Sequence, residues 1–311
     1  MAAPPASLSD RLRAWRRRIK ARLPYVRRRE HRLLSRRYAE LIESMGWTAP
    51  LATEAGLQVM KPVAEVLRGD MCFFVSHAAQ PRLKRHVLLH VEHLLQAGVN
   101  VVLILNTDLA PAQIDISPEL LDRLGGVYVR DNVGFDFAAW AHVFCLLHDR
   151  SRQWSRLFLV NDSIVGPLDL NDFDMLMRKV RQSNADVIGL TENRTPVPHV
   201  QSFFLVLAAS ALAHPAVTRA FRRMFSLPSK GQVIDVYEAR LTKMLAEQGL
   251  RFETVFEPLS SDPSSSDDTM QRWEELIRAG FPFIKYSILS LPAASEKVRA
   301  LVPPELLPSD D

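Results

Sequence analysis

The stretch GGVYVRDNVGFDFAAWAHVFCLLHD, residues 125–149, joins a strand-like segment to a helix-like one. Its first part, GGVYVRDN, is a short apolar run that ends in charged and polar residues, which is typical of a buried strand. The second part begins near Asp136, and its apolar residues recur at helical spacing. These residues are Phe137, Trp140, Ala141, Phe144 and Leu147. The stretch therefore predicts a strand followed directly by a helix with one buried face.

The same alternation extends in both directions along the chain. Upstream, MCFFVSH (71–77) and VNVVLILN (99–106) are strand-like, and KRHVLLHVEHLLQAG (84–98) between them has helical spacing. Downstream, RLFLVND (156–162) and ADVIGLTEN (185–193) predict two more strands. Strands that alternate with helices predict an α/β fold, with a Rossmann-like, mostly parallel sheet flanked by helices.

Almost every predicted strand ends in polar residues. In open parallel sheets, ligands bind beyond the carboxyl ends of the strands, so these side chains are expected to converge on one polar cleft. The residues at the predicted strand ends are His77, Asn106, Arg130, Asp131, Asn132, Asn161, Asp162, Ser163, Thr191, Glu192 and Asn193.

The composition indicates a soluble globular protein, since 47% of the 311 residues are hydrophobic and 24% are charged. The two cysteines have no paired spacing, which favours a reducing compartment over a disulfide framework or a zinc site. The N-terminal sequence has no apolar core typical of a signal peptide, and the apolar runs are too short to span a bilayer. We therefore expect a cytoplasmic protein.

The net charge of +4 is unevenly distributed. Residues 1–45 contain 13 Lys and Arg against four acids, a balance of +9, so the remainder carries 4 − 9 = −5. We expect a basic helical arm over residues 1–60, followed by one domain over residues 61–311. Leu12, Trp15, Ile19 and Leu23 lie at roughly helical spacing in this arm.

Such an arm can bind an anionic membrane surface, which would place the protein at the inner face of the cytoplasmic membrane. The alternatives are a solvated or partner-binding arm and a nucleic-acid contact. Because the rest of the chain is acidic, we expect no nucleic-acid partner.

Two motifs carry candidate chemistry. In the first, Asn132 and Gly134 lie between a strand end and the helix that begins near Asp136. A glycine permits close backbone approach, and free N–H groups at a helix start bind anions, which suits a phosphate or a sugar hydroxyl. Alternatively, Asp136 simply caps the helix.

The second motif is FLVNDSIVGP, residues 158–167, in which Asn161, Asp162 and Ser163 follow a buried strand. A carboxylate at this position can hold Mg²⁺ through oxygen ligands, or it can bind sugar hydroxyls directly. Alternatively, the three residues form an Asx turn that leads into Gly166 and Pro167.

Together, RDNVGFDFAAW, FLVNDSIVGPL, GLTEN followed by HVQSFFLV, and YEARL resemble the rhamnan synthesis protein F family. The order of the motifs is also similar to that of nucleotide-sugar glycosyltransferases of the GT-A type. The resemblance implies a GT-A-like domain that moves a sugar, with rhamnose favoured, from a nucleoside-diphosphate donor. The implied acceptor is a growing bacterial polysaccharide or a lipid-linked glycan.

The resemblance also implies roles for single residues. Glu238 heads a helix with Leu241, Leu245 and Gly249 at offsets that resemble those of a catalytic acid in the large inverting GT-A families, so it is the expected catalytic base. The donor-binding residues are expected to be His77, Arg130, Asn132, Gly134, Asp136, Asn161, Asp162, Ser163 and Lys285. The residues that face the acceptor or the sugar are expected to be Asn193, His199, Gln201 and Ser202.

One departure from the GT-A pattern concerns the metal. Many GT-A enzymes have Asp-x-Asp at the end of the fourth strand, whereas this chain has Asn-Asp-Ser. Asp162 can still hold Mg²⁺ or Mn²⁺, or cations such as Lys285 and Arg130 can replace the metal. The alternative to an enzyme is a non-catalytic saccharide-binding or scaffold protein of a polysaccharide assembly complex.

Overall fold

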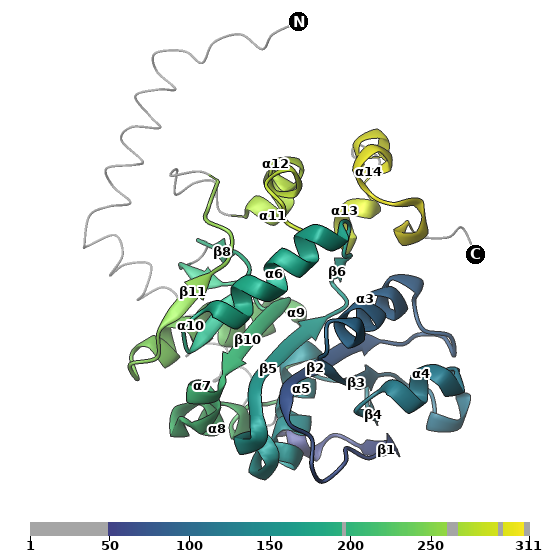
Figure 1. Ribbon diagram of the computed structural model, residues 1–311. Coiled ribbons are helices and arrows are strands. Elements are labelled where there is room, and N and C mark those ends of the chain that lie inside the picture. Colours follow the sequence, from purple (N-terminus) through teal and green to yellow (C-terminus); the bar gives the residue numbers. More distant parts are fainter. Residues whose placement is uncertain (1–48, 195–196, 260–266, 292–294, 308–311) are drawn as a thin grey trace, which may run out of the picture.

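The computed structural model describes residues 49–194, 197–259, 267–291 and 295–307. Within them, a central sheet carries helices on both faces (Figure 1). The order of its strands is β1-β4-β3-β2-β5-β10-β7-β11. The bounds are β1 Leu57–Lys61, β2 Gly69–His77, β3 Asn100–Asn106, β4 Gly126–Arg130, β5 Trp154–Asn161, β7 Val187–Gly189, β10 Phe204–Ala208 and β11 Phe252–Thr254.

The sheet is mostly parallel, as predicted. Strands β4, β3, β2 and β5 run parallel to one another. Strand β10 runs antiparallel to both of its neighbours, β5 and β7, while β11 is parallel to β7. At the other edge, β1 is antiparallel to β4. Of the eight strands that the described residues form, six therefore run in one direction.

The central strands are apolar on both faces because both faces are covered. In β2, Met71, Phe73 and Val75 point into one core, whereas Cys72 and Phe74 point into the other. A strand that is buried on both faces appears in the sequence as a continuous apolar run, which explains MCFFV.

The helices divide between the two faces of the sheet. In the described residues, α5, α7, α8, α9 and α10 contribute to one core, and α3, α4, α6 and α12 contribute to the other. The bounds are α3 Arg85–Gln96, α4 Pro118–Arg123, α5 Phe135–Leu147, α6 Leu170–Gln182, α7 Ala209–Ala213, α8 Pro215–Arg222, α9 Lys230–Val233, α10 Ala239–Ala246, α11 Asp268–Gln271, α12 Trp273–Arg278, α13 Tyr286–Leu289 and α14 Ser295–Leu301. Short 3-10 turns are η1 Ala52–Glu54, η2 Pro111–Gln113, η3 His148–Gln153 and η6 Pro304–Leu306.

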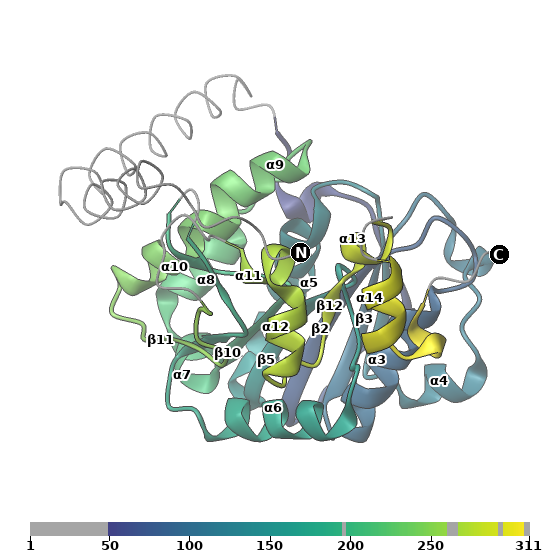
Figure 2. The same cartoon turned by 90° about the horizontal axis from the view of Figure 1, so that it is seen from above.

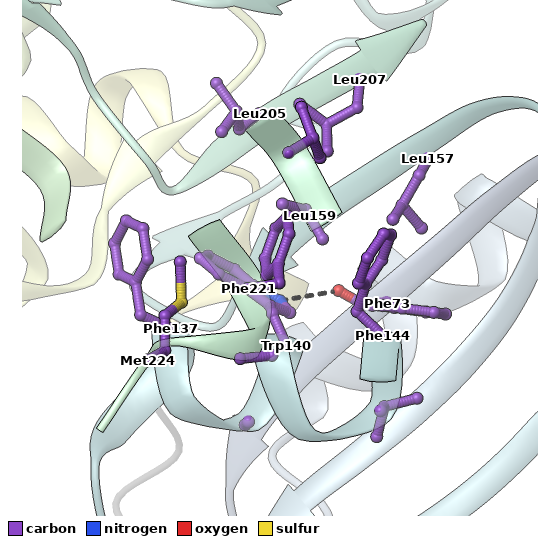
Figure 3. Close-up of a cluster of buried hydrophobic side chains, with 14 of the residues drawn as sticks. Phe73, Phe137, Trp140, Phe144, Leu157, Leu159, Leu205, Leu207, Phe221 and Met224 are labelled. Atoms are coloured by element: carbon purple, nitrogen blue, oxygen red, sulfur yellow. Dashed lines mark hydrogen bonds between the residues drawn. The ribbon is translucent and has the colours of Figure 1, made fainter. Parts of the chain in front are cut away.

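Helix α5 is the centre of the first core (Figure 3). Its Trp140 is fully buried and donates its indole N–H to the carbonyl oxygen of Phe73 in β2, at 3.0 Å. Phe144 of the same helix stacks on Phe221 of α8, with ring centroids 4.6 Å apart. The helix is therefore fixed between the sheet and the α7–α8 pair, and its first turn is held rigidly at the edge of the sheet.

The C-terminal segment covers the second face. Phe281, Phe283 and Ile284 are buried, and Ile284–Lys285 forms strand β12, which pairs with β6 (Ile164–Val165). Figure 2 shows the yellow helices α12 and α14 near α6 and α3. Residues 281–288 thus contribute buried side chains to the cores of the domain.

The strand order reverses between β2 and β5. From β2 the chain passes through α3 to β3 and then through α4 to β4, moving toward one edge of the sheet. It then crosses by α5 to β5, on the other side of β2. The carboxyl ends of β2 and β5 thus lie side by side at a topological switch point, where open α/β sheets bind ligands.

Two details differ from the predictions. The expected arm reached residue 60, but η1 packs on α5 and β1 belongs to the sheet, so residues 51–60 are part of the folded domain. Residues 1–48, which hold nearly all of the expected arm, lie outside the described residues. The helix that Glu238 was expected to head does not begin there: α9 continues through a π-helical turn, Ile234–Glu238, into α10.

Candidate functional site

The turn after β5 contains both features that its sequence suggested. Asn161 Oδ1 accepts hydrogen bonds from Ser163 N at 3.1 Å and Ser163 Oγ at 2.5 Å, which is an Asx turn. Asn161 Nδ2 also donates to Asp136 Oδ2 at 2.5 Å. The asparagine and the serine therefore shape the turn, and Asn161 links it to the first turn of α5.

Asp162 joins the two strands at the switch point. Its Oδ2 accepts hydrogen bonds from Ser76 Oγ at 2.8 Å and from the His77 N–H at 3.2 Å, both at the end of β2. The same oxygen accepts from Lys84 Nζ at 2.6 Å. The side chains of Lys84 and Asp162 are 39% and 20% exposed, so this ion pair reaches the surface of the site.

Asp136 is the second residue of α5 and lies beside Asn161. Its pKa is raised mainly by burial of the carboxyl group and further by the negative charge of Glu238. Hydrogen bonds from the Phe137 N–H and from Asn161 act in the opposite direction. Gly134, not Asp136, occupies the N-cap of the helix, so the capping interpretation of Asp136 is wrong.

Glu238 ends the π-helical turn and is partly buried. Its Oε1 accepts a hydrogen bond from the backbone N–H of Ser202 at 3.0 Å. Single π-helical turns inside helices occur frequently at functional sites. The buried residues Leu241 and Leu245 of α10 anchor the helix that follows and fix the position of the carboxylate.

Lys285 approaches the same carboxylates from β12. Its Nζ lies 4.0 Å from the centroid of the Phe203 ring, a cation–π contact. Burial lowers the pKa of Lys285 to about 8, while the negative charges of Glu238 and Asp267 counteract the shift. The charges of Asp136 and Glu238, which lie on different helices, thus both act on one lysine.

His77 and Asn132 lie on the opposite side of the switch point. Their side chains are exposed, and Nε2 of His77 is 3.3 Å from Nδ2 of Asn132. His77 is the last residue of β2 and Asn132 follows β4, so the two predicted donor-binding residues lie together at the carboxyl ends of these strands.

The structure does not place Arg130 in the site. Its side chain is 1% exposed and points beneath α5, on the same face of β4 as Tyr128. The guanidinium donates to carbonyl oxygens of Ala52, Asp131 and Val133, to Ser226 Oγ and to Nδ1 of His142. The prediction that Arg130 binds a donor is wrong, because its hydrogen-bond donors are used to fix the loop before α5.

The structure explains why residue 134 is a glycine, for a reason that the sequence did not reveal. Its φ is +76°, and a Cβ atom built on it would lie 2.6 Å from Ala138 Cβ and 2.7 Å from Ser226 Cα. The close approach that requires glycine is therefore made by the chain itself, and a ligand is not needed to explain this glycine.

The predicted acceptor residues lie on and after a small hairpin formed by β8 (Glu192–Asn193) and β9 (His199–Val200), in which Asn193 pairs with His199. His199 and Gln201 are buried. Gln201 accepts from Thr191 Oγ1 at 2.7 Å and donates to Asp267 Oδ1 at 3.4 Å, so its polar atoms are satisfied within the protein. Ser202 lies directly beside Glu238.

Sequence reasoning missed Lys84 and the aromatic platform of Phe203. Lys84 immediately precedes α3, where it resembled an ordinary basic residue at the start of an amphipathic helix. Its position shortly after β2 was the available signal. Among the described residues, no three His, Cys, Asp or Glu side chains come together as a metal-binding group.

The comparison with known families identifies the protein class. The sequence model described as Rhamnan synthesis protein F matches residues 101–302, which is 202 of the 311 residues. The chain belongs to this family. The matched range contains Asp136, Asp162, Glu238 and Lys285, whereas β2 and Lys84 precede it. Membership of the rhamnan synthesis protein F family indicates a role in polysaccharide biosynthesis.

A curated relative of this rhamnan synthesis protein F family member is "Uncharacterized protein y4gN" of Sinorhizobium fredii. It is 28% identical over 203 residues, which cover 64% of this chain and 50% of the relative. The present chain thus spans about half the length of that relative. In the part of the chain that the structure describes, no helix is both long enough and apolar enough to cross a membrane.

Proposed function

We propose that the protein is a glycosyltransferase that moves a sugar from a nucleoside-diphosphate donor to an acceptor hydroxyl. The observation that carries this proposal is that Asp136 is hydrogen-bonded to Asn161 at the end of β5, while the charge of Glu238 acts on both Asp136 and Lys285. The family name favours rhamnose as the sugar. The acceptor that we propose is a growing bacterial polysaccharide or a lipid-linked glycan.

Sugar transfer has two chemical requirements that these residues meet. The transition state has oxocarbenium character, as in glycoside hydrolysis, and the acceptor hydroxyl must lose a proton to a general base. The departing diphosphate also needs its negative charge stabilised by groups that are already in place. A carboxylate and an ammonium held by the same site supply both functions.

We assign the base to Glu238. Its Oε1 is held by the backbone N–H of Ser202, while the side chain remains partly exposed, so the carboxylate is oriented and still reachable by an acceptor. Burial of Asp136, together with the negative charge of Glu238, raises the pKa of Asp136, so its carboxyl group holds a proton more readily than an exposed aspartate does. Asp136 then helps to hold Asn161 and the turn, whereas Glu238 accepts the proton.

We place the donor across the carboxyl ends of β2, β4 and β5. Asn161 and Ser163 would contact the diphosphate and the sugar, Asp162 would hold Lys84 beside them, and the exposed pair His77 and Asn132 would contact the nucleoside. The acceptor would approach from the β8–β9 hairpin, where Ser202 adjoins Glu238. This orientation puts the base on the acceptor side of the sugar.

The proposal is tested by donor turnover. The purified full chain is incubated with a panel of nucleoside-diphosphate sugars that includes rhamnose donors, and release of the nucleoside diphosphate is measured with and without glycan acceptors. We expect one donor to be hydrolysed slowly by water and faster with an acceptor. A chain that binds a saccharide but releases no nucleoside diphosphate from any donor would instead be a binding or scaffold protein.

A further inference from the structure

The charged side chains at the switch point determine how a diphosphate could be bound there. A bound diphosphate needs its negative charge balanced by a metal ion or by cationic side chains. Mg²⁺ and Mn²⁺ sites use several oxygen ligands, commonly carboxylates. In the turn 161–163, Asp162 is the carboxylate that could serve such an ion.

The surroundings of Asp162 do not fit a metal ligand. Its Oδ2 already accepts three hydrogen bonds, from Ser76 Oγ, from the His77 N–H and from Lys84 Nζ. A divalent ion on this carboxylate would lie close to an ammonium group that is 2.6 Å from the same oxygen. The two cations would repel each other. Within the described ranges, no set of three candidate ligands gathers to offset this repulsion.

The same contacts make Lys84 a well-placed cation. Lys84 lies at the N-cap of α3, and a positive charge at a helix N-terminus is unfavourable unless it is paired. Asp162 provides the pairing, and Ser76 fixes the orientation of its carboxylate. Lys84 is nevertheless 39% exposed, so an ammonium held in one position still faces a ligand at the ends of β2 and β5.

Lys285 flanks the same turn on the other side. It pairs with Ile164 in the β6–β12 ladder, and the N–H of the next residue, Tyr286, donates to Ser163 O at 2.8 Å. Its ammonium rests on Phe203, whose carbonyl oxygen accepts from Asn161 N at 3.2 Å. The backbone contacts around residues 161–163 therefore fix the position of Lys285, as Asp162 fixes that of Lys84.

We propose that this site binds a diphosphate between Lys84 and Lys285, without a divalent metal ion, and that Asp162 is the positioning residue for Lys84. This inference rests on the proposed function for the identity of the ligand. It assigns to two lysines the charge neutralisation that Mg²⁺ or Mn²⁺ was expected to provide, and it gives a reason for the single carboxylate in Asn-Asp-Ser.

The test is calorimetric titration of the full chain with UDP, GDP and dTDP, in EDTA and again in excess MgCl₂ or MnCl₂. We expect at least one diphosphate to bind as tightly in EDTA as with the metal, or more tightly, because Mg²⁺ complexes the free diphosphate. Binding that occurs only with Mg²⁺ or Mn²⁺ would overturn the proposal.

Substitutions separate the two lysines from general charge effects. Lys84→Gln and Lys285→Gln should each weaken binding in EDTA by about 10- to 100-fold, the usual loss for a hydrogen bond to a charged group. Arg82→Gln is the matched control, because Arg82 is 89% exposed in the same loop and pairs with Asp115. Equal weakening by the control would contradict a specific site. Thermal unfolding of each variant confirms that it folds, and Lys84→Arg should restore part of the affinity.

Asp162→Asn distinguishes positioning from metal binding. If Asp162 positions Lys84, this variant weakens diphosphate binding in EDTA and leaves the response to Mg²⁺ as in the unsubstituted protein. A variant that loses only a Mg²⁺-dependent increase in affinity would show Asp162 to be a metal ligand. Donor turnover is scored separately. Turnover that requires Mg²⁺ would reject this inference alone, and lysine-dependent diphosphate binding without turnover would reject only the enzyme.

Discussion

Gly134 shows how little space the loop before α5 leaves. A side chain there would adopt an unfavourable positive φ and would meet Ser226 and Ala138 within 3 Å. We predict that Gly134→Ala destabilises the protein by about 2–4 kcal/mol, from left-handed strain and overpacking together. Gly231→Ala is the control, because Gly231 lies in α9 with no atom near the added methyl group. Urea unfolding of both variants measures the difference, and equal stability would contradict it.

His90 is a buried titratable residue whose ionisation is coupled to the stability of the fold. Its ring is fully buried against Phe74, Phe204 and Phe283, and neither nitrogen has a hydrogen-bond partner among the described residues. Burial is the main cause that lowers the pKa of His90 to about 3, and the neighbouring histidines His86 and His93 add to the shift.

The lowered pKa sets the direction of the pH effect. The unfolded chain takes up a proton on His90 below its ordinary pKa of 6.5, whereas the folded protein does not until about 3. The contribution of His90 to stability is therefore intact above pH 6.5 and is lost as the pH falls. Between pH 7 and pH 4.5, we predict that His90→Phe loses about 2–3 kcal/mol less stability than the unsubstituted protein. Denaturant unfolding at both pH values measures this, and equal losses would contradict it.

At the scale of elements, strand β12 connects the C-terminal segment to the site. Phe283 is 0% exposed and contacts Phe173, Phe204 and His90, and Lys285 lies two residues further along the chain. We predict that Phe283→Ala costs about 3–5 kcal/mol of stability and also weakens diphosphate binding, since β12 positions Lys285. Leu291→Ala, at an exposed position after α13, should do neither. Normal diphosphate affinity in a folded Phe283→Ala variant would separate β12 from the site.

The elements also show which structures can be predicted from sequence. Strands β2, β3, β4 and β5 follow from continuous apolar runs, and α3 follows from helical periodicity. Helix α5 was predicted with one buried face, whereas it is buried on all sides, since Ala138, Ala139 and Val143 are buried as well. The antiparallel insertion of β10 between β5 and β7 does not follow, because β7 and β11 have only three residues each and their order depends on tertiary packing. The π-helical turn before α10 cannot be predicted either, because the apolar pattern of the sequence continues on both sides of it.

In the candidate site, the sequence indicated which residues have suitable chemistry, but it did not indicate the direction in which each side chain points. Asn161 is hydrogen-bonded to Asp136, and the charge of Glu238 acts on both Asp136 and Lys285. Arg130 ends a strand beside them but points into the core beneath α5, because alternate residues of a strand face opposite sides and Arg130 shares the face of Tyr128. The partner of Asp162, Lys84, is 78 residues distant in sequence, so only the parallel pairing of β2 and β5 reveals it.

In the whole molecule, the formal charge of the N-terminal segment differs in sign from that of the rest of the chain. Residues 1–45 carry a formal charge of +9 and the remainder −5. We predict that deletion of residues 1–45 lowers binding to anionic vesicles and leaves donor hydrolysis unchanged, because the residues proposed for catalysis lie in the folded domain. Vesicle sedimentation at low and high salt measures the effect, with neutral vesicles as the control. Unchanged binding to anionic vesicles would reject a membrane role for the arm.

The proposal that Glu238 is the base of a sugar transfer at the switch point is tested by one paired measurement. Donor affinity by calorimetry and donor turnover are compared in the unsubstituted protein, in Glu238→Gln and in Glu247→Gln, an exposed control on the same helical segment. We predict that Glu238→Gln binds the donor normally while turnover falls by roughly 10²- to 10⁴-fold, the range for general acid–base catalysis. Turnover by Glu238→Gln equal to that of the control would contradict the account.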